Sequence, residues 1–321
     1  MTDWPNHTAA WHEWRDAIGG ARMHHGWILA GKAGLGKHDF ALAAARELVA
    51  EEGIPQPTGD HPDIIVLTHL PKDDKEERKR EEGKPFEVKR NITVAQIRAM
   101  QQRLTTRPTL GSRRAVIIDP ADDMERGASN ALLKSLEEPP QGTFFLLVTH
   151  RPAGLLPTIR SRCRMLRFPQ LSDAAIASHL GGEFPAVSAT ERELAVAMAG
   201  GSLGAARGFL QQELGGVAQA IRSLVAQGDP GFELRGRLAA AVGARPDRER
   251  MRAVIELART TLARALPDAR PEQHSGLIEA HAELVTLAAQ APTYNFDPGL
   301  LVGEIASLLA RAAGASEPAH G

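Results

Sequence analysis

The chain has 321 residues, of which 43% are hydrophobic, and a formal net charge of -1. That length suffices for two or three domains with a core each, and the near-zero charge excludes a global basic field that would attract nucleic acid. The single cysteine, Cys163, excludes a disulfide framework and a cysteine-based zinc site. Because we find no apolar signal region and no apolar run of membrane-spanning length, we expect the cytoplasm.

The first predicted elements surround a glycine-rich turn. Residues 5–20 have the spacing of an amphipathic helix, and residues 27–30 form a short apolar strand. The strand leads into a G-x-x-x-x-G-K turn, and a helix follows through Val49. Glycines let consecutive backbone N–H groups curl around an anion, and the lysine adds a positive charge. The turn therefore predicts a loop that binds the phosphates of ATP or ADP through Gly31, Gly34, Gly36 and Lys37.

The residue after the lysine departs from this motif. A serine or threonine normally stands there, because its hydroxyl binds Mg²⁺ beside the phosphates. Here the residue is His38, and imidazole is a poor ligand for a hard cation that prefers oxygen. We therefore expect the loop to hold phosphate and to use Mg²⁺ weakly or not at all.

The next part of the chain alternates between strands and helices. Residues 64–67 predict a buried strand. Residues 71–90 carry eight basic and seven acidic side chains, which favours a solvated loop. Thr93 and Gln96 form a capping box that opens a helix ending before Pro108.

A third strand, residues 115–118, ends in a carboxylate. In phosphate-loop enzymes an aspartate at this point holds Mg²⁺ directly or through water, so Asp119 joins the predicted site. Hydrolases of this branch follow it with a glutamate that polarises the attacking water, but here the residue is Pro120, which has no titratable group. Together with His38, this proline removes two of the parts that hydrolysis needs.

The remaining sequence completes an α/β region and then becomes helical. A helix within residues 129–138 is stopped by prolines, and the strand at 144–148 has Thr149 at its tip. The alternation over residues 27–168 predicts a mostly parallel sheet. Apolar spacing then predicts three helices between Leu171 and Gln212 and five more up to residue 313.

Two long blocks carry a family resemblance. S-N-A-L-L-K-S-L-E-E-P-P at 129–140 and L-P-T-I-R-S-R-C at 156–163, together with the phosphate loop, resemble the clamp-loader subunits of bacterial DNA polymerase III, within the AAA+ superfamily. The resemblance implies an α/β fold in three domains. These are an AAA+ P-loop nucleotide-binding-like domain at 1–168, a three-helix lid at 169–214, and an all-α oligomerisation collar at 215–321.

Differences from other members of this family indicate which type of subunit the chain resembles most. Motor subunits of the gamma/tau type are expected to keep the serine or threonine and the glutamate that are His38 and Pro120 here, so the chain is most similar to the delta-prime type. Many relatives carry a cysteine-rich zinc module between the first helix of the core and the second strand. The interval from Glu51 to Pro62 has no cysteine, so no zinc is expected.

The resemblance also implies roles for three more residues. Arg162, in the Ser-Arg-Cys block, matches the arginine finger that reaches across a subunit boundary toward a neighbour's nucleotide. Thr149 matches the sensor on the fourth strand, and Arg207 matches the lid arginine that contacts a nucleotide held by the same chain.

The implied function is that of a largely non-hydrolysing subunit. It would donate its finger to a neighbouring ATPase and help to load the sliding clamp on primed DNA, with delta and gamma/tau subunits as partners. An alternative is an active gamma/tau-like motor in which Asp122 or Asp123 replaces the missing glutamate. A phosphate-loop kinase or unrelated nucleotide switch would leave the two family blocks unexplained.

Overall fold

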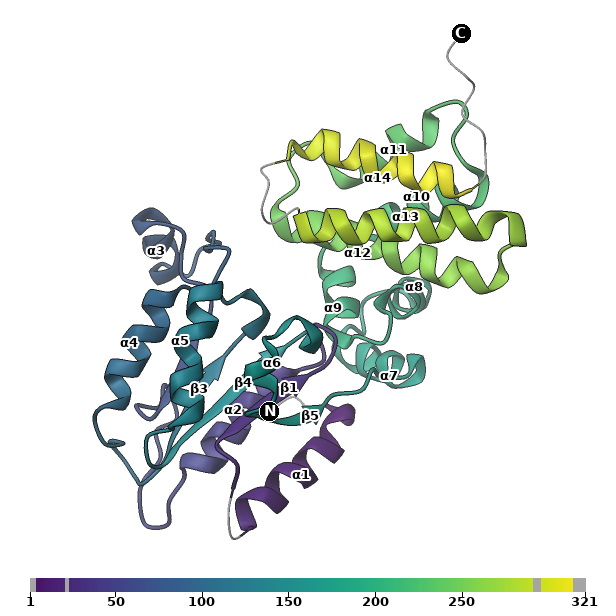
Figure 1. Cartoon of the computed structure of the whole chain (residues 1–321). Helices are drawn as coiled ribbons and strands as arrows, with labels where there is room; N and C mark the ends of the chain where they lie inside the picture. The colour runs from purple at the N-terminus through teal and green to yellow at the C-terminus, as the bar shows by residue number, and fades with distance from the viewer. Residues whose placement is uncertain (1–3, 21–22, 291–295, 314–321) are drawn as a thin grey trace. The chain divides into compact units, whose positions relative to one another are not determined.

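The chain divides into two compact units, Met1–Gln170 and Leu171–Gly321 (Figure 1). The computed structural model describes residues 4–20, 23–290 and 296–313. The first unit ends two residues after the end predicted for the sheet domain, and the further division of the second unit into lid and collar stays a prediction. Among the described helices, none is both long enough and apolar enough to cross a membrane.

A five-stranded sheet forms the centre of the first unit. Its strand order is β2-β3-β4-β1-β5, and all four strand pairings are parallel. β1 and β3 are buried along their whole length, as expected of strands covered on both faces. The predicted α/β fold class with a parallel sheet is confirmed. The strands are β1 (Gly26–Ala30), β2 (Ile64–Leu67), β3 (Arg114–Ile118), β4 (Thr143–Thr149) and β5 (Arg164–Arg167).

Helices cover both faces of this sheet (Figure 1). One face packs against α1 and α2 around Trp14, Trp27 and Phe40. The other packs against α4, α5 and α6, where alternate residues of the same strands meet Ile97 and Leu132. The helices are α1 (Thr8–Gly19), α2 (Lys37–Val49), α4 (Val94–Leu104), α5 (Arg126–Glu137) and α6 (Pro157–Arg160), with short 3-10 turns η1 (Pro5–His7), η2 (Ala121–Asp123) and η3 (Pro152–Gly154).

The charged segment at 71–90 is not the loop that its composition predicts. It contains a short helix, α3 (Asp74–Glu81). The Asp73 carboxylate caps this helix by accepting from two backbone N–H groups, each at 3.0 Å. Glu76 is buried and accepts from the backbone N–H of Glu87 at 2.7 Å. The loop expectation was wrong because acidic residues in the first turn and basic residues in the last stabilise the helix dipole.

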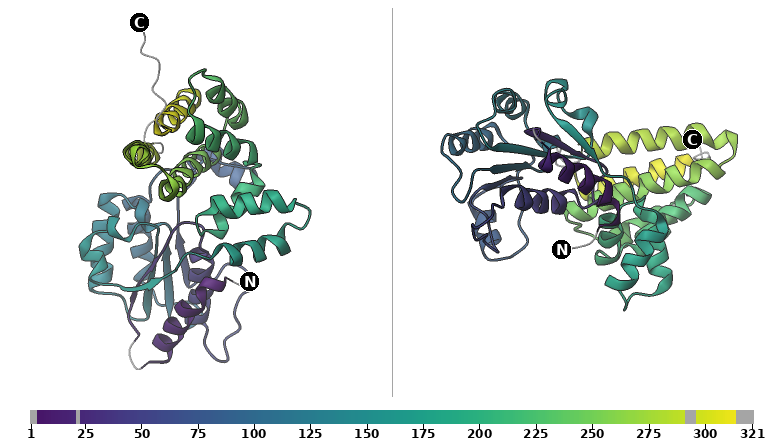
Figure 2. Two further views of the ribbon diagram at one scale, coloured as in Figure 1. Left: turned by 90° about the vertical axis from the view of Figure 1, so that its right-hand side faces the viewer. Right: turned by 90° about the horizontal axis from the view of Figure 1, so that it is seen from below.

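The described part of the second unit consists of helices and their connections, in agreement with the three helices predicted up to Gln212 and the five predicted after it. The long helices α12, α13 and α14 pack side by side (Figure 2). α8 begins with a capping box between Ser188 and Glu191. The helices are α7 (Asp173–Glu183), α8 (Ala189–Ala199), α9 (Leu203–Gln211), α10 (Gly215–Gln227), α11 (Glu233–Val242), α12 (Arg248–Ala265), α13 (Pro271–Gln290) and α14 (Pro298–Ala312), with the turn η4 (Leu266–Asp268) after α12.

Candidate functional site

Most of the predicted site residues lie at one end of the sheet, where the strands have their carboxyl ends. Because the strands are parallel, the segments that follow β1, β3 and β4 leave the sheet on the same side. Ala30 at the end of β1 pairs with Thr149, and Ile118 at the end of β3 pairs with Leu147. The phosphate loop, Asp119 and Thr149 therefore meet although they are distant in the sequence.

The phosphate loop is closed around its own lysine. Gly36 precedes α2 in the left-handed conformation, with φ of 72°, which a residue without a Cβ adopts readily. Lys37 is only 3% exposed, and its Nζ donates to the carbonyl oxygens of Gly31 and Lys32, each at 2.7 Å. Burial lowers the pKa of Lys37 to about 8, although the nearby Asp119 carboxylate opposes this shift. The ammonium group thus occupies the inside of the loop.

His38 contacts the predicted metal-binding carboxylate directly. Its Nδ1 lies 2.6 Å from Oδ2 of Asp119. Since an ionised carboxylate can only accept, the imidazole nitrogen is the donor. This hydrogen bond raises the pKa of His38. The side chain of Asp119 is 16% exposed, and that of His38 is 46% exposed. The two residues therefore act as a pair at the mouth of the loop.

The two acids considered as replacement bases both have partners. Asp122 accepts three hydrogen bonds, from the Thr149 hydroxyl at 2.6 Å and from the backbone N–H groups of His150 and Arg151 at 2.5 and 3.2 Å. Oδ2 of Asp123 lies 3.2 Å from Nε2 of His69. Thr149, the predicted sensor, is fully buried and directs its hydroxyl to Asp122. These contacts tie the tip of β4 to the segment after β3.

Sequence reasoning missed an N-terminal clamp, formed by Trp4 and His7, on the phosphate loop. A Cβ added to Gly36 would lie 2.3 Å from two carbons of the Trp4 ring. The indole Nε1 of Trp4 donates to Oδ2 of Asp39 at 3.0 Å, and the Nε2 of His7 lies 2.8 Å from the carbonyl oxygen of Leu35. The two rings stack on each other. No local pattern signals this clamp, because its contacts join residues about thirty positions apart.

Arg162 lies at the end of the sheet opposite to the phosphate loop, where the strands begin. It comes just before β5, which runs parallel to β1 with Arg164 beside Trp27. Its Nη2 lies 2.7 Å from Oε1 of Glu137, its Nη1 donates to the carbonyl oxygen of Thr158 at 3.0 Å, and its side chain is 35% exposed. Arg162 is thus displaced from the loop of its own chain, and its role as an arginine finger stays a prediction.

Arg207 belongs to the second unit. It lies on α9, and its Nε donates to Oε2 of Glu183 at 2.7 Å. Its predicted contact with a nucleotide stays a prediction.

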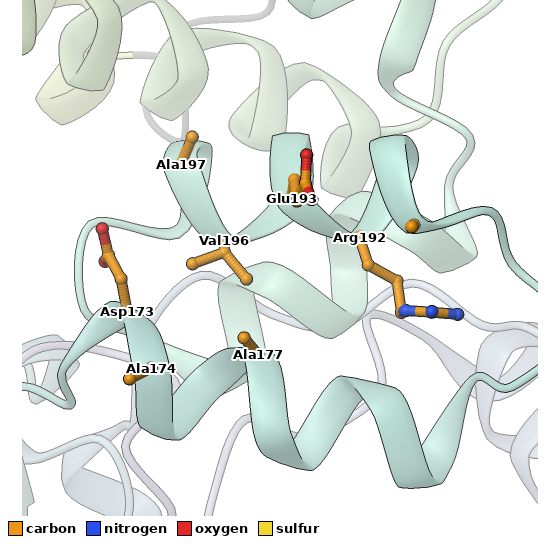
Figure 3. Close-up of a pocket in the computed structure, with 8 residues that line it drawn as sticks. Asp173, Ala174, Ala177, Arg192, Glu193, Val196 and Ala197 are labelled. Atoms are coloured by element: carbon orange, nitrogen blue, oxygen red, sulfur yellow. The ribbon is translucent and has the colours of Figure 1, made fainter.

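A groove of about 400 Å³ lies between α7 and α8 (Figure 3). None of the predicted site residues lines it. Half of the residues that line it are alanines, and the full lining is Asp173, Ala174, Ala177, Ala189, Arg192, Glu193, Val196 and Ala197.

The sheet order and the loop define a phosphate-loop protein of the AAA+ class in which a histidine fills the usual place of a metal-binding hydroxyl. A family model described as "DNA polymerase III, delta subunit" matches residues 6–172, just over half of the chain. The chain therefore belongs to the DNA polymerase III delta-subunit family.

Individual relatives agree with this assignment. The DNA polymerase III subunit delta' of Pseudomonas aeruginosa is 33% identical over 201 residues, which cover 59% of this chain and 56% of the relative. The subunit delta' of Bacillus subtilis is 34% identical over 170 residues, covering 50% and 46%. The chain thus matches about half the length of these relatives. A solved DNA polymerase III gamma subunit-related protein of Thermotoga maritima is 18% identical, with a TM-score of 0.49 over 94% of this chain and 98% of that one. At that level it adds nothing to the assignment.

Proposed function

We propose that this chain is a delta-prime-type subunit of a bacterial clamp loader that does not hydrolyse ATP and donates Arg162 to a neighbouring ATPase subunit. In this role it would work in the cytoplasm with delta and gamma/tau subunits, and the assembly would place the sliding clamp on primed DNA. The observation that carries the proposal is the hydrogen bond between His38 and Asp119, because these residues occupy the two positions from which a working ATPase holds Mg²⁺.

The surroundings of the loop also argue against a motor. Hydrolysis needs a group that polarises the attacking water, and Pro120 cannot do so. Asp122 would have to give up its bonds to the Thr149 hydroxyl and to two backbone N–H groups. Asp123 is paired with His69. The active-motor alternative therefore lacks a carboxylate that is ready to act as the base.

The placement of Arg162 fits donation to another subunit. Its guanidinium is partly exposed, and the residue lies at the end of the sheet opposite to the loop of its own chain. An arginine finger supplied by a neighbour is worth about 10³–10⁵ in rate to the site that receives it, or about 4–7 kcal/mol of barrier. A subunit that gives a finger but cannot turn over ATP would act as a fixed end of the assembly.

Two measurements test the proposal. The purified chain should hydrolyse ATP no faster than background in the presence of Mg²⁺, and turnover at the rate of motor subunits would refute the non-hydrolysing role. In a complex reconstituted with delta and gamma/tau subunits, Arg162→Ala should lower the ATPase rate while assembly, followed by size-exclusion chromatography, is unchanged. The matched control is Arg160→Ala, which removes an exposed arginine from α6. Equal rates for the wild-type and Arg162→Ala complexes would remove Arg162 from the mechanism.

A further inference from the structure

The phosphate-loop fold implies a Mg²⁺ ion beside the phosphates, but the residues of this chain do not fit one. Mg²⁺ requires near-octahedral oxygen ligands at about 2.0–2.1 Å. The position of the ligating hydroxyl is taken by His38, and the Nδ1–H of its ring points at Oδ2 of Asp119 over 2.6 Å. A proton lies between these atoms, so neither one presents a lone pair to a cation between them.

We infer that this pocket binds a nucleoside polyphosphate in its metal-free form, because the hydrogen bond between His38 and Asp119 occupies the place of the usual cation. The inference rests on the proposed function in that it concerns the same degenerate pocket. It does not depend on whether Arg162 acts as a finger.

The other carboxylates near the loop do not rescue a metal site. Asp122 has accepted three hydrogen bonds, and Asp123 is paired with His69. Within the described residues, no group of three or more His, Cys, Asp or Glu side chains is arranged to hold a metal ion. A hydrated Mg²⁺ would therefore have to displace at least one of these existing contacts.

The same contacts leave the pocket suited to an anion without a metal. The Nζ of Lys37 donates to two carbonyl oxygens inside the loop. These oxygens are neutral acceptors, and a charged phosphate oxygen would be a stronger acceptor for the same ammonium group. α2 begins at Lys37 without a side-chain cap, and the N-terminus of a helix favours an anion. The Oδ2 atom of Asp119 accepts a hydrogen bond from His38, so this oxygen is directed to the imidazole. Positive charge beside the phosphates is thus supplied by Lys37 of the chain itself.

Calorimetric titration of the full-length chain with ADP tests this inference. We expect binding in EDTA, and a weaker apparent affinity when excess Mg²⁺ is present, because the cation removes free ADP from solution. His38→Thr restores the hydroxyl and releases Asp119, so its affinity should shift in the opposite direction and become tighter with Mg²⁺. His12→Thr, an exposed histidine of α1, should behave like the wild type. Because the His38 side chain is 46% exposed, the variant is expected to fold, which a thermal melt checks.

Three results would overturn the inference. They are tighter binding of ADP by the wild type with Mg²⁺ than with EDTA, the absence of ADP binding under both conditions, and a folded His38→Thr variant whose response to Mg²⁺ equals that of the wild type. None of them bears on the Arg162→Ala experiment, so failure of this inference and failure of the proposed function can be told apart.

Discussion

Replacing Gly36 by alanine should destabilise the first unit through two separate effects. Alanine in the left-handed conformation costs about 1–2 kcal/mol. Its Cβ would also lie 2.3 Å from the Trp4 ring, an overlap of the kind that costs about 1–3 kcal/mol when a packed region must shift. The expected loss in the free energy of unfolding for Gly36→Ala is therefore about 2–5 kcal/mol.

The N-terminal clamp makes this cost conditional. Trp4→Ala alone should cost about 3–5 kcal/mol, as for other buried aromatic side chains, but it also removes the ring that the new methyl group would strike. In the Trp4→Ala background, Gly36→Ala should keep only its backbone cost. The loss in the free energy of unfolding of the double variant should thus be about 1–3 kcal/mol smaller than the sum of the losses of the two single variants.

Urea unfolding followed by tryptophan fluorescence measures this coupling. The four tryptophans of the chain all lie in the first unit, so the signal reports that unit alone. Gly53→Ala is the matched control, because Gly53 has φ of 79° but nothing within 4 Å of an added Cβ. Its loss should be additive with that of Trp4→Ala. Additivity to within about 0.5 kcal/mol for Gly36→Ala as well would show that the ring does not cover the loop.

Three further predictions concern residues outside the loop. Burial raises the pKa of Cys163 to about 12, so the native chain should react slowly with a thiol reagent at pH 8 and rapidly in urea, and prompt labelling of the native chain would contradict its burial. Asp63→Ala should cost about 3–5 kcal/mol in urea unfolding, since it leaves the buried Arg114 without its carboxylate partner at 3.5 Å; a loss below 1 kcal/mol would count against that pair. Burial also lowers the pKa of His25 below its ordinary 6.5, so the unfolded state binds more protons below that pH and stability is lost as the pH falls. His25→Gln should flatten this loss between about pH 7 and pH 5, and an unchanged pH profile would show that His25 does not cause it.

Most of the helices and strands, and the residues of the phosphate loop, could be predicted from the sequence. Continuous apolar runs located the buried strands, and the capping box between Thr93 and Gln96 is present at the start of α4. His38 and Asp119 were each identified as unusual or functional from their places in a motif. Their direct bond could not be predicted, because it depends on the spatial order of β1, β4 and β3.

The features that were missed are set by contacts distant in the sequence or by the order of charges. The contact of Trp4 with Asp39 joins two segments that share no motif. The pairing of Arg162 with Glu137 likewise joins the start of β5 to the end of α5. In the segment 71–90, the balance of charges suggested solvent exposure, whereas their order along the chain stabilises a helix.

The N-terminal clamp has a practical consequence for the design of variants. The Trp4 ring lies against Gly36 of the phosphate loop, and its Nε1 donates to Asp39 at the start of α2. A deletion or fusion that displaces Trp4 would therefore also disturb the pocket, and such a protein would be unsuitable for measurements of ligand binding.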